Sequence, residues 1–208
     1  MDAYYERRAP EYDDWYRGTG LFADRDRPGW HAELRDLVRA ISSLSPATTL
    51  DVACGTGFVT RSLPGRVVGL DRSDAMLRIA RGRVAGPVVR ADGLALPFRD
   101  GSFERVFAGH AYGHLEGAAR GRFLEEARRV ADELVVLDTA RREGVGAEEH
   151  QVRVLSDGSR HRVYKRFFDA GELGEEIGGG RPLFAGRWFV LVASPVVRSA
   201  PGRRRSGS

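Results

Sequence analysis

The segment Leu50–Phe58, which reads LDVACGTGF, decides the fold class of this chain. An apolar strand pattern runs directly into a loop with Gly55 and Gly57, and we expect a helix over residues 57–63. Glycine lacks a Cβ atom, so it permits positive φ angles and a close approach of the backbone to a ligand. Ligands of open α/β sheets bind at such carboxyl ends of strands. The segment therefore predicts a ligand site where this strand ends.

Strand and helix patterns alternate from this segment onwards. Helical spacing of apolar residues marks 73–81 and 117–130, and Ser73 is the expected N-cap of the first of these helices. Short apolar runs predict strands near residues 49–53, 67–70, 88–90, 103–108 and 134–137. This alternation predicts a parallel sheet that is covered by helices on both faces.

The last third of the chain has a different pattern. Its two closing runs, residues 183–185 and 188–193, are separated by Gly186 and Arg187, which is typical of an antiparallel hairpin. Before them we expect short strands at 152–155 and 160–168 and a helix at 169–177. We therefore predict a doubly wound, Rossmann-like α/β fold, with a mostly parallel seven-stranded sheet, an antiparallel edge hairpin and helices on both faces.

A chain of 208 residues has the size of one domain, and we predict a single domain over residues 1–197. Residues 1–44 are its expected helical cap region, with helices near 2–16 and 30–44. Residues 198–208 hold four arginines and no acid, so they account for the whole formal charge of +4, because 4 − 4 = 0 remains for the rest. This composition is typical of a disordered basic tail, and nucleic acid is not a predicted partner.

The expected compartment follows from what the sequence contains. A single cysteine, Cys54, excludes an internal disulfide and fits a reducing compartment. We find no signal-peptide pattern, and no apolar run approaches the ~20 residues of a membrane span. The histidines are scattered without metal-ligand spacing, so no metal is predicted. We expect a soluble, cytoplasmic protein.

Three features bear on the class of cofactor. The loop lacks the third glycine of the dinucleotide fingerprint, since Thr60 stands in its place. Asp51, just ahead of the loop, would repel a pyrophosphate but attract an ammonium group. Asp71 ends the next strand, where its carboxylate can accept hydrogen bonds from both hydroxyls of a ribose; capping of a helix is the alternative role. The first two features favour S-adenosylmethionine, which has no phosphate and carries an amino acid group.

At four positions the sequence resembles the class I S-adenosylmethionine-dependent methyltransferases, particularly the branch with the ubiquinone and menaquinone methyltransferases. The four are the loop 51–57, Asp71, the segment 91–98 (ADGLALPF) and the strand 103–108. The Asp-x-x-x-Leu-Pro-Phe run, followed by Asp-Gly-Ser-Phe, is quite specific to this branch. The resemblance covers roughly residues 4–136. Ala53, where many members carry glycine, is a tolerated departure.

The resemblance implies S-adenosylmethionine as cofactor, S-adenosylhomocysteine as product and a small molecule as methyl acceptor. It places the methionine part at Gly55 and Gly57, with the amino group at Asp51 and the ribose at Asp71. The rest of the implied cofactor-binding set is Ala53, Arg72, Met76, Asp92, Gly93, Leu94 and Gly109. Plain turn formation is the alternative role of the glycines and of Asp92.

Candidate catalytic residues follow the fourth strand, whose end faces the sulfonium in similar enzymes. The segment 108–116 (AGHAYGHLE) holds His110 and His114 beside Tyr112, which is an alternative wall of the pocket. Histidine has an unperturbed pKa of ~6.5, so either residue is a candidate general base. A structural role for His114 is an equal alternative, because related enzymes carry a His-Leu pair that begins a helix here.

Tyr5 and Tyr12 are the aromatic residues expected nearest the site, because the first segment folds over the cofactor in similar enzymes. An aromatic face attracts a sulfonium by on the order of 1 kcal/mol, and plain helix packing is the alternative. A later polar cluster, His150, Arg160, His161, Arg162, Tyr164 and Arg166, is either an acceptor lining or a solvated strand face.

The leading hypothesis is methyl transfer from S-adenosylmethionine to a small molecule. The alternatives are an NAD(P)-dependent oxidoreductase and a non-catalytic, S-adenosylmethionine-binding regulatory protein. The motifs of nucleic-acid methyltransferases, Asn/Asp-Pro-Pro-aromatic and Pro-Cys, do not occur. The sequence carries no motif for the acceptor, the methylated atom or the oligomeric state.

Overall fold

A seven-stranded sheet runs through the structure in the order β3-β2-β1-β4-β5-β9-β8. The computed structural model describes residues 2–195, so the predicted tail lies outside the described residues. Neighbouring strands from β3 to β5 are parallel, whereas β9 is antiparallel to β5 and β8. The strands are β1 (Ala47–Val52), β2 (Gly65–Asp71), β3 (Val88–Arg90), β4 (Phe103–Gly109), β5 (Ala131–Thr139), β8 (Arg181–Ala185) and β9 (Phe189–Pro195). The predicted fold class is confirmed.

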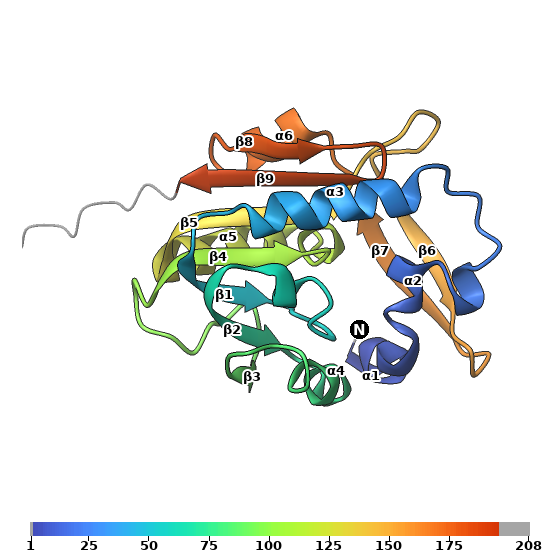
Figure 1. Ribbon diagram of the computed structural model, residues 1–208, viewed down its shortest axis with the longest axis horizontal. Coiled ribbons are helices and arrows are strands. Elements are labelled where there is room, and N and C mark those ends of the chain that lie inside the picture. The colour runs from blue at the N-terminus through green and yellow to red at the C-terminus, as the bar shows by residue number, and fades with distance from the viewer. Residues whose placement is uncertain (1, 196–208) are drawn as a thin grey trace, which may run out of the picture.

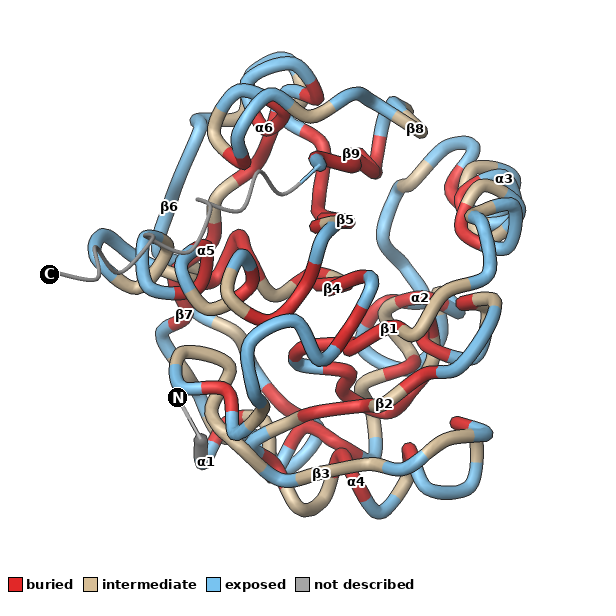
Figure 2. Tube along the Cα trace, turned by 90° about the vertical axis from the view of Figure 1, so that its left-hand side faces the viewer, coloured by how far each residue is buried: buried red, intermediate tan, exposed pale blue. Residues whose placement is uncertain are grey.

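Helices cover both faces of this sheet (Figure 1). Helices α5 (Ala118–Val130) and α6 (Ala170–Glu176) pack on one face, and α3 (Trp30–Ser42) packs on the other. The central strands are buried along most of their length, while exposed residues lie on the outer sides of the helices (Figure 2). The apolar runs predicted as strands are therefore the core of the molecule.

Two predicted helices are wrong in extent. Residues 57–63 form turns and the short 3-10 helix Thr60–Ser62, because Gly57 has a φ of +76° and Pro64 follows, which leaves less than two helical turns. The predicted helix 2–16 is divided into α1 (Asp2–Arg8) and α2 (Asp14–Arg17) by a 3-10 turn that contains Pro10. The predicted N-cap of α4 (Asp74–Ala80) is confirmed, since Ser73 Oγ accepts the N–H of Met76 at 3.1 Å.

A cap of four elements lies at the carboxyl ends of the parallel strands (Figure 1). We use this name for α1, α2 and the antiparallel hairpin of β6 (Glu148–Val154) and β7 (Arg160–Arg166). Tyr4 of α1 packs with Leu155 and Val163 of the hairpin in a small apolar cluster of its own. The hairpin is thus joined to the N-terminal segment, a pairing that the sequence did not predict.

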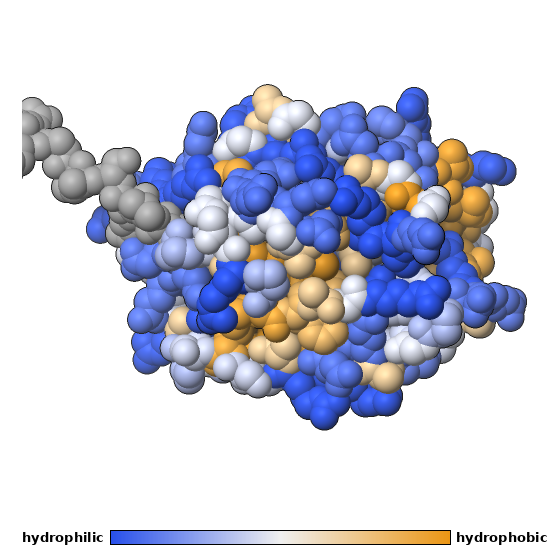
Figure 3. All heavy atoms as spheres, turned by 90° about the horizontal axis from the view of Figure 1, so that it is seen from above, coloured by the Kyte–Doolittle hydropathy of each residue, from blue (hydrophilic) through white to orange (hydrophobic). Residues whose placement is uncertain are grey.

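Apolar surface gathers in a central strip when the molecule is seen from above, where β8, β9 and α3 face the viewer (Figure 3). The core cluster beneath α3 includes side chains that are only partly buried, among them Leu183 and Phe184 of β8.

Within residues 2–195 no helix is both long and apolar enough to cross a membrane. The predicted single domain over residues 1–197 stays a prediction.

Candidate active site

A cavity of about 340 Å³ lies at the ends of β1, β2 and β4, beneath α1. It brings together all of the predicted site residues except Asp51 and Gly57. Those that line it are Tyr5, Tyr12, Ala53, Gly55, Asp71, Arg72, Met76, Asp92, Gly93, Leu94, Gly109, His110 and His114. Residues from five separate stretches of sequence therefore form one continuous surface.

The carboxylate of Asp71 is held in place by the glycine loop. The backbone N–H of Gly55 donates to its Oδ2 and that of Ser73 to its Oδ1, both at 2.9 Å. Burial raises the pKa of Asp71, although these two amides oppose the shift. Each carboxylate oxygen has a second lone pair, so Asp71 can still accept hydrogen bonds from two hydroxyls of a ligand.

Asp51 lies behind the lining of this cavity. It is buried, its Oδ2 accepts the hydroxyl of Thr60 at 2.6 Å, and its Oδ1 has no partner among the described residues. Burial raises the pKa of Asp51 to about 7. It borders a smaller hollow together with Tyr12 and Ala53. The free Oδ1 is the acceptor that an ammonium group reached through this hollow would need.

Gly57 has a packing reason to be glycine. Its φ is +76°, and a Cβ atom there would lie 2.9 Å from Cγ2 of Val84. Gly57 therefore packs against Val84, which follows α4. It does not line the cavity, and its predicted contact with the cofactor stays a prediction.

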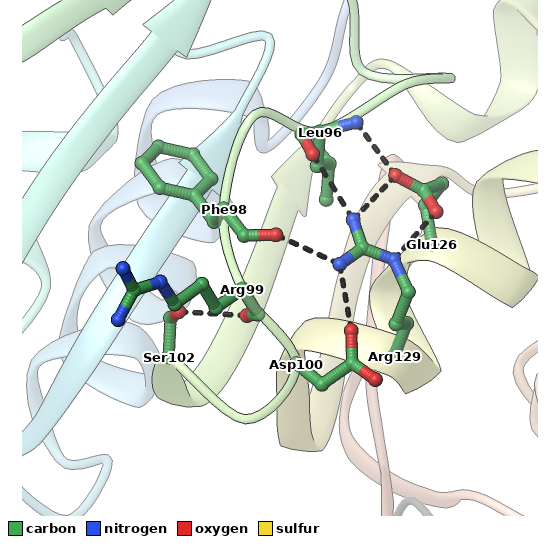
Figure 4. A network of polar contacts seen from close by, with 7 residues as sticks. All are labelled: Leu96, Phe98, Arg99, Asp100, Ser102, Glu126 and Arg129. Carbon is green, nitrogen blue, oxygen red and sulfur yellow. Dashed lines mark hydrogen bonds and ion pairs between the residues drawn. The ribbon is translucent and has the colours of Figure 1, made fainter.

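The loop that carries Asp92 is fixed by a charged pair on α5 (Figure 4). Arg129 donates to the carbonyl oxygens of Leu96 and Phe98 at 3.0 and 2.7 Å. Glu126 binds the same guanidinium and accepts the N–H of Leu96 at 2.6 Å. The Leu-Pro-Phe part of the specific motif is thus structural, and it holds the loop beside the cavity.

His110 is buried against the cavity without a hydrogen bond. It has a φ of +56°, and neither ring nitrogen has a partner among the described residues. Its Nδ1 lies 4.0 Å from Oδ1 of Asp138, and Trp15 and Phe189 pack against its ring. Burial lowers the pKa of His110 to about 3. The ring is therefore neutral at pH 7, and no described residue forms a hydrogen bond with either nitrogen.

His114 has a fixed tautomer. Its Nδ1 lies 2.6 Å from the carbonyl oxygen of Tyr164. A carbonyl only accepts, so Nδ1 carries the proton and Nε2 keeps its lone pair. Burial and the charge of Lys165 lower the pKa of His114 well below its usual value. The bond to β7 gives His114 a structural role and at the same time leaves one nitrogen able to accept a proton.

The comparisons with known proteins agree with this geometry. Residues 50–133 match the family model of a methyltransferase domain. The demethylmenaquinone methyltransferase of Thermotoga maritima is 38% identical over 45% of this chain and 43% of its own length. That of Lactiplantibacillus plantarum is 33% identical over 65% of the chain and 61% of its own. The chain thus spans about half of the length of these relatives.

The chain is also similar to the solved structure of the DhpI–SAH complex, with a TM-score of 0.70 and 25% sequence identity. The alignment covers 94% of this chain and 95% of that chain. These matches identify residues 50–133 as a methyltransferase domain, and the fold of the chain is that of the class I S-adenosylmethionine-dependent methyltransferases. The predicted recognition is confirmed, and the oxidoreductase alternative gains no support.

The residues of this methyltransferase domain fit the family's cofactor, S-adenosylmethionine. Asp71 presents free lone pairs at the end of β2, and Asp51 has an orphaned buried oxygen near the glycine loop. Among the described residues that line the cavity, the charged ones are Asp71, Arg72, Asp92 and Glu116. Such a lining suits a ligand that has a ribose and an ammonium group but no phosphate.

Two further residues of this methyltransferase domain were missed in the sequence. Asp138 of β5 and Lys165 of β7 form a buried ion pair behind the histidines, and Asp138 also accepts the N–H of Gly113 at 2.7 Å. The available signal was that Lys165 is the one lysine of the chain. None of the residues of the later polar cluster borders the cavity, and His150, Arg160 and Arg162 are exposed, so the structure favours the solvated strand face over the acceptor lining.

Proposed function

We propose that this chain transfers a methyl group from S-adenosylmethionine to a small-molecule acceptor and releases S-adenosylhomocysteine. The cavity supports the proposal most directly, since it joins the Asp71 carboxylate to two uncharged histidines across one continuous surface. The match of residues 50–133 to a methyltransferase domain supports the same activity. A small molecule is the proposed partner, nucleic acid is not, and the cytoplasmic location stays a prediction.

When bound, the cofactor supplies a methyl group on a positively charged sulfur. In this proposal Asp71 accepts the ribose hydroxyls, and the free oxygen of Asp51 accepts from the amino group. The rings of Tyr5 and Tyr12 cover the sulfonium side and exclude water. Most of the catalytic effect then comes from holding the acceptor atom in line behind the methyl group.

In this proposal one of the two histidines, His110 or His114, takes up the proton that the methylated hydroxyl or amine loses. Their low pKa values keep them neutral at pH 7, so each ring offers a lone pair. Such a ring is a weak base in the empty cavity, and Asp138, 4.0 Å from Nδ1 of His110, stabilises the imidazolium when it forms. An acceptor hydroxyl or amine fits this arrangement.

Isothermal titration with S-adenosylhomocysteine and, separately, NADH tests the cofactor. We expect S-adenosylhomocysteine to bind and Asp71→Ala to weaken it on the order of 100-fold, because two charge-assisted hydrogen bonds are lost. Asp74→Ala is the matched control, since Asp74 pairs with Arg90 on the surface. Binding of NADH alone would overturn the proposal, and binding without turnover of any acceptor would favour the regulatory alternative.

A further inference from the structure

Three arginines lie close together. Two belong to the cap, Arg8 of α1 and Arg153 of β6, and Arg25 follows the 3-10 helix Gly20–Phe22. The guanidinium carbons of Arg8 and Arg153 lie 5.7 and 5.9 Å from the centroid of the Tyr4 ring. Those of Arg8 and Arg25 lie 5.2 and 4.6 Å from the centroid of Phe22. We call Arg8, Arg25 and Arg153 the arginine cluster. Arg8 shares the ring of Tyr4 with Arg153 and the ring of Phe22 with Arg25, so the three positive charges lie near one another.

The cluster is not neutralised by the side chains around it. Glu11 is the one carboxylate paired with it among the described residues, and its Oε1 lies 3.9 Å from Arg8 Nη1, beyond hydrogen-bond distance. Arg153 donates to Gln151 and to the hydroxyl of Tyr4, which carry no charge. Burial and the charges of its two partners lower the pKa of Arg25. An excess of positive charge therefore remains in the cap.

Arg8 is the strongest sign of a missing partner. It is 4% exposed, and its guanidinium makes no hydrogen bond to any residue in 2–195. A guanidinium has five N–H donors, and leaving them without hydrogen-bond partners in a side chain with so little exposure is costly. A ligand with several acceptor oxygens would satisfy these donors.

The arginine cluster does not border the cavity itself but lies behind two tyrosines of its lining. Arg8 lies 5.8 Å from the centroid of Tyr12, whose ring borders the cavity. Arg153 donates to Tyr4, which packs on Tyr5 of the cavity lining with the ring centroids 4.8 Å apart. The charge of Arg153 also reaches both His110 and His114, since it lowers the pKa of each. The arginine cluster thus supplies positive charge behind the tyrosines of the cavity lining.

We propose that the arginine cluster binds an anionic group of the methyl acceptor, a carboxylate or a phosphate-type oxyanion, while the atom to be methylated lies beside His110 and His114. This inference rests on the proposed function and adds the substrate class to it. Guanidinium groups bind such oxyanions through paired hydrogen bonds. The anion enters from the side of Arg25, which is exposed to solvent.

The test titrates the protein, saturated with S-adenosylhomocysteine, with inorganic phosphate and with benzoate at an ionic strength held constant with sodium chloride. We expect one of these oxyanions to bind, and Arg8→Gln and Arg153→Gln each to weaken it about tenfold or more. Arg7→Gln is the matched control, because Arg7 is the next residue of α1, is exposed and pairs with Asp157. The better of the two anions identifies the chemical class.

The possible results separate the two proposals. Binding of S-adenosylhomocysteine with no binding of either anion would overturn the anion site and leave the methyltransferase proposal intact. An equal loss in Arg7→Gln would also overturn it, because the effect would then be one of net charge. No binding of S-adenosylhomocysteine would reject the proposed function, and this inference with it. If Arg8→Gln fails to fold, Arg153→Gln, which is half-buried, decides alone.

Discussion

The cavity has two walls that hold their polar groups differently. On the cofactor wall, Asp71 and Asp92 already accept hydrogen bonds from backbone N–H groups, those of Gly55 and Ser73 and that of Leu94. On the histidine wall, the nitrogens of His110 and, behind Tyr12, the donors of Arg8 have no hydrogen-bond partners among the described residues. Buried polar groups are normally satisfied. The comparison indicates that Asp71 and Asp92 are oriented before their ligand arrives, whereas the free groups of the second wall, like Oδ1 of Asp51 behind the first, are left for a ligand.

Removing the support of the histidine wall is expected to have the largest effect. Asp138→Asn leaves Lys165 buried without its counter-charge, which costs about 3–5 kcal/mol of the free energy of unfolding. Urea unfolding measures this loss. The control is the double variant Asp138→Asn/Lys165→Met, in which neither charge remains and the amide oxygen can still accept the N–H of Gly113, so most of the stability returns. A single variant as stable as the wild type would show that the pair contributes nothing to this wall.

The unsatisfied His110 is expected to make stability depend on pH. Its pKa is about 3 in the folded chain and near 6.5 when unfolded, so the unfolded state binds the extra proton between these values. The contribution of His110 is therefore present above pH 6.5 and is lost as the pH falls, by about 1.4 kcal/mol per pH unit.

The variant His110→Asn isolates this contribution, because asparagine tolerates the left-handed backbone and does not titrate. Asp51 acts in the opposite direction, since its raised pKa of about 7 adds stability that is lost as the pH rises from about 4 to 7. Asp51 is present in both proteins, so it cancels in the difference. Urea unfolding between pH 4 and 8 measures that difference. A difference that does not change with pH would mean that His110 is solvated in the native state.

A smaller effect is expected from loosening the cofactor wall. Arg129→Ala removes the hydrogen bonds to Leu96 and Phe98, and we expect a loss of about 1–3 kcal/mol of stability. Arg122→Ala on the exposed side of α5 is the control. Thermal unfolding gives the stability, and titration with S-adenosylhomocysteine shows whether the loop around Asp92 transmits the change. Equal melting temperatures for both variants would contradict the structural role of the motif.

The cofactor wall was predictable from the sequence because its chemistry is local. Gly55, Asp71 and Asp92 each follow a strand directly, and the carboxyl ends of parallel strands meet at one edge of a sheet. Position in the chain was therefore enough to bring them together. The same reasoning placed His110 and Gly109 at the end of β4.

The histidine wall could be predicted only in part. Which residues of the β6–β7 hairpin face inwards depends on its packing against α1, so Arg153 and Lys165 were missed, and the two alternatives for the polar cluster stayed open. Spacing also could not show that Arg8 is buried whereas Arg7 is exposed. These properties arise from contacts between segments about 150 residues apart, for which the sequence has no local signal.

The smallest expected effect distinguishes the two glycines of the loop. Both have positive φ angles, so Gly55→Ala and Gly57→Ala should each lose about 1 kcal/mol of stability, with a further cost for Gly57→Ala from the contact with Val84. Gly55 borders the cavity and its N–H holds Asp71, so Gly55→Ala should weaken S-adenosylhomocysteine several-fold. Gly57→Ala should leave the affinity within about twofold. Titration of both variants measures the two affinities, and a melting curve of each accounts for the loss of stability. An equal loss of affinity would mean that the cofactor wall extends to Gly57, as the sequence predicted, whereas unequal losses would limit it to the residues that line the cavity.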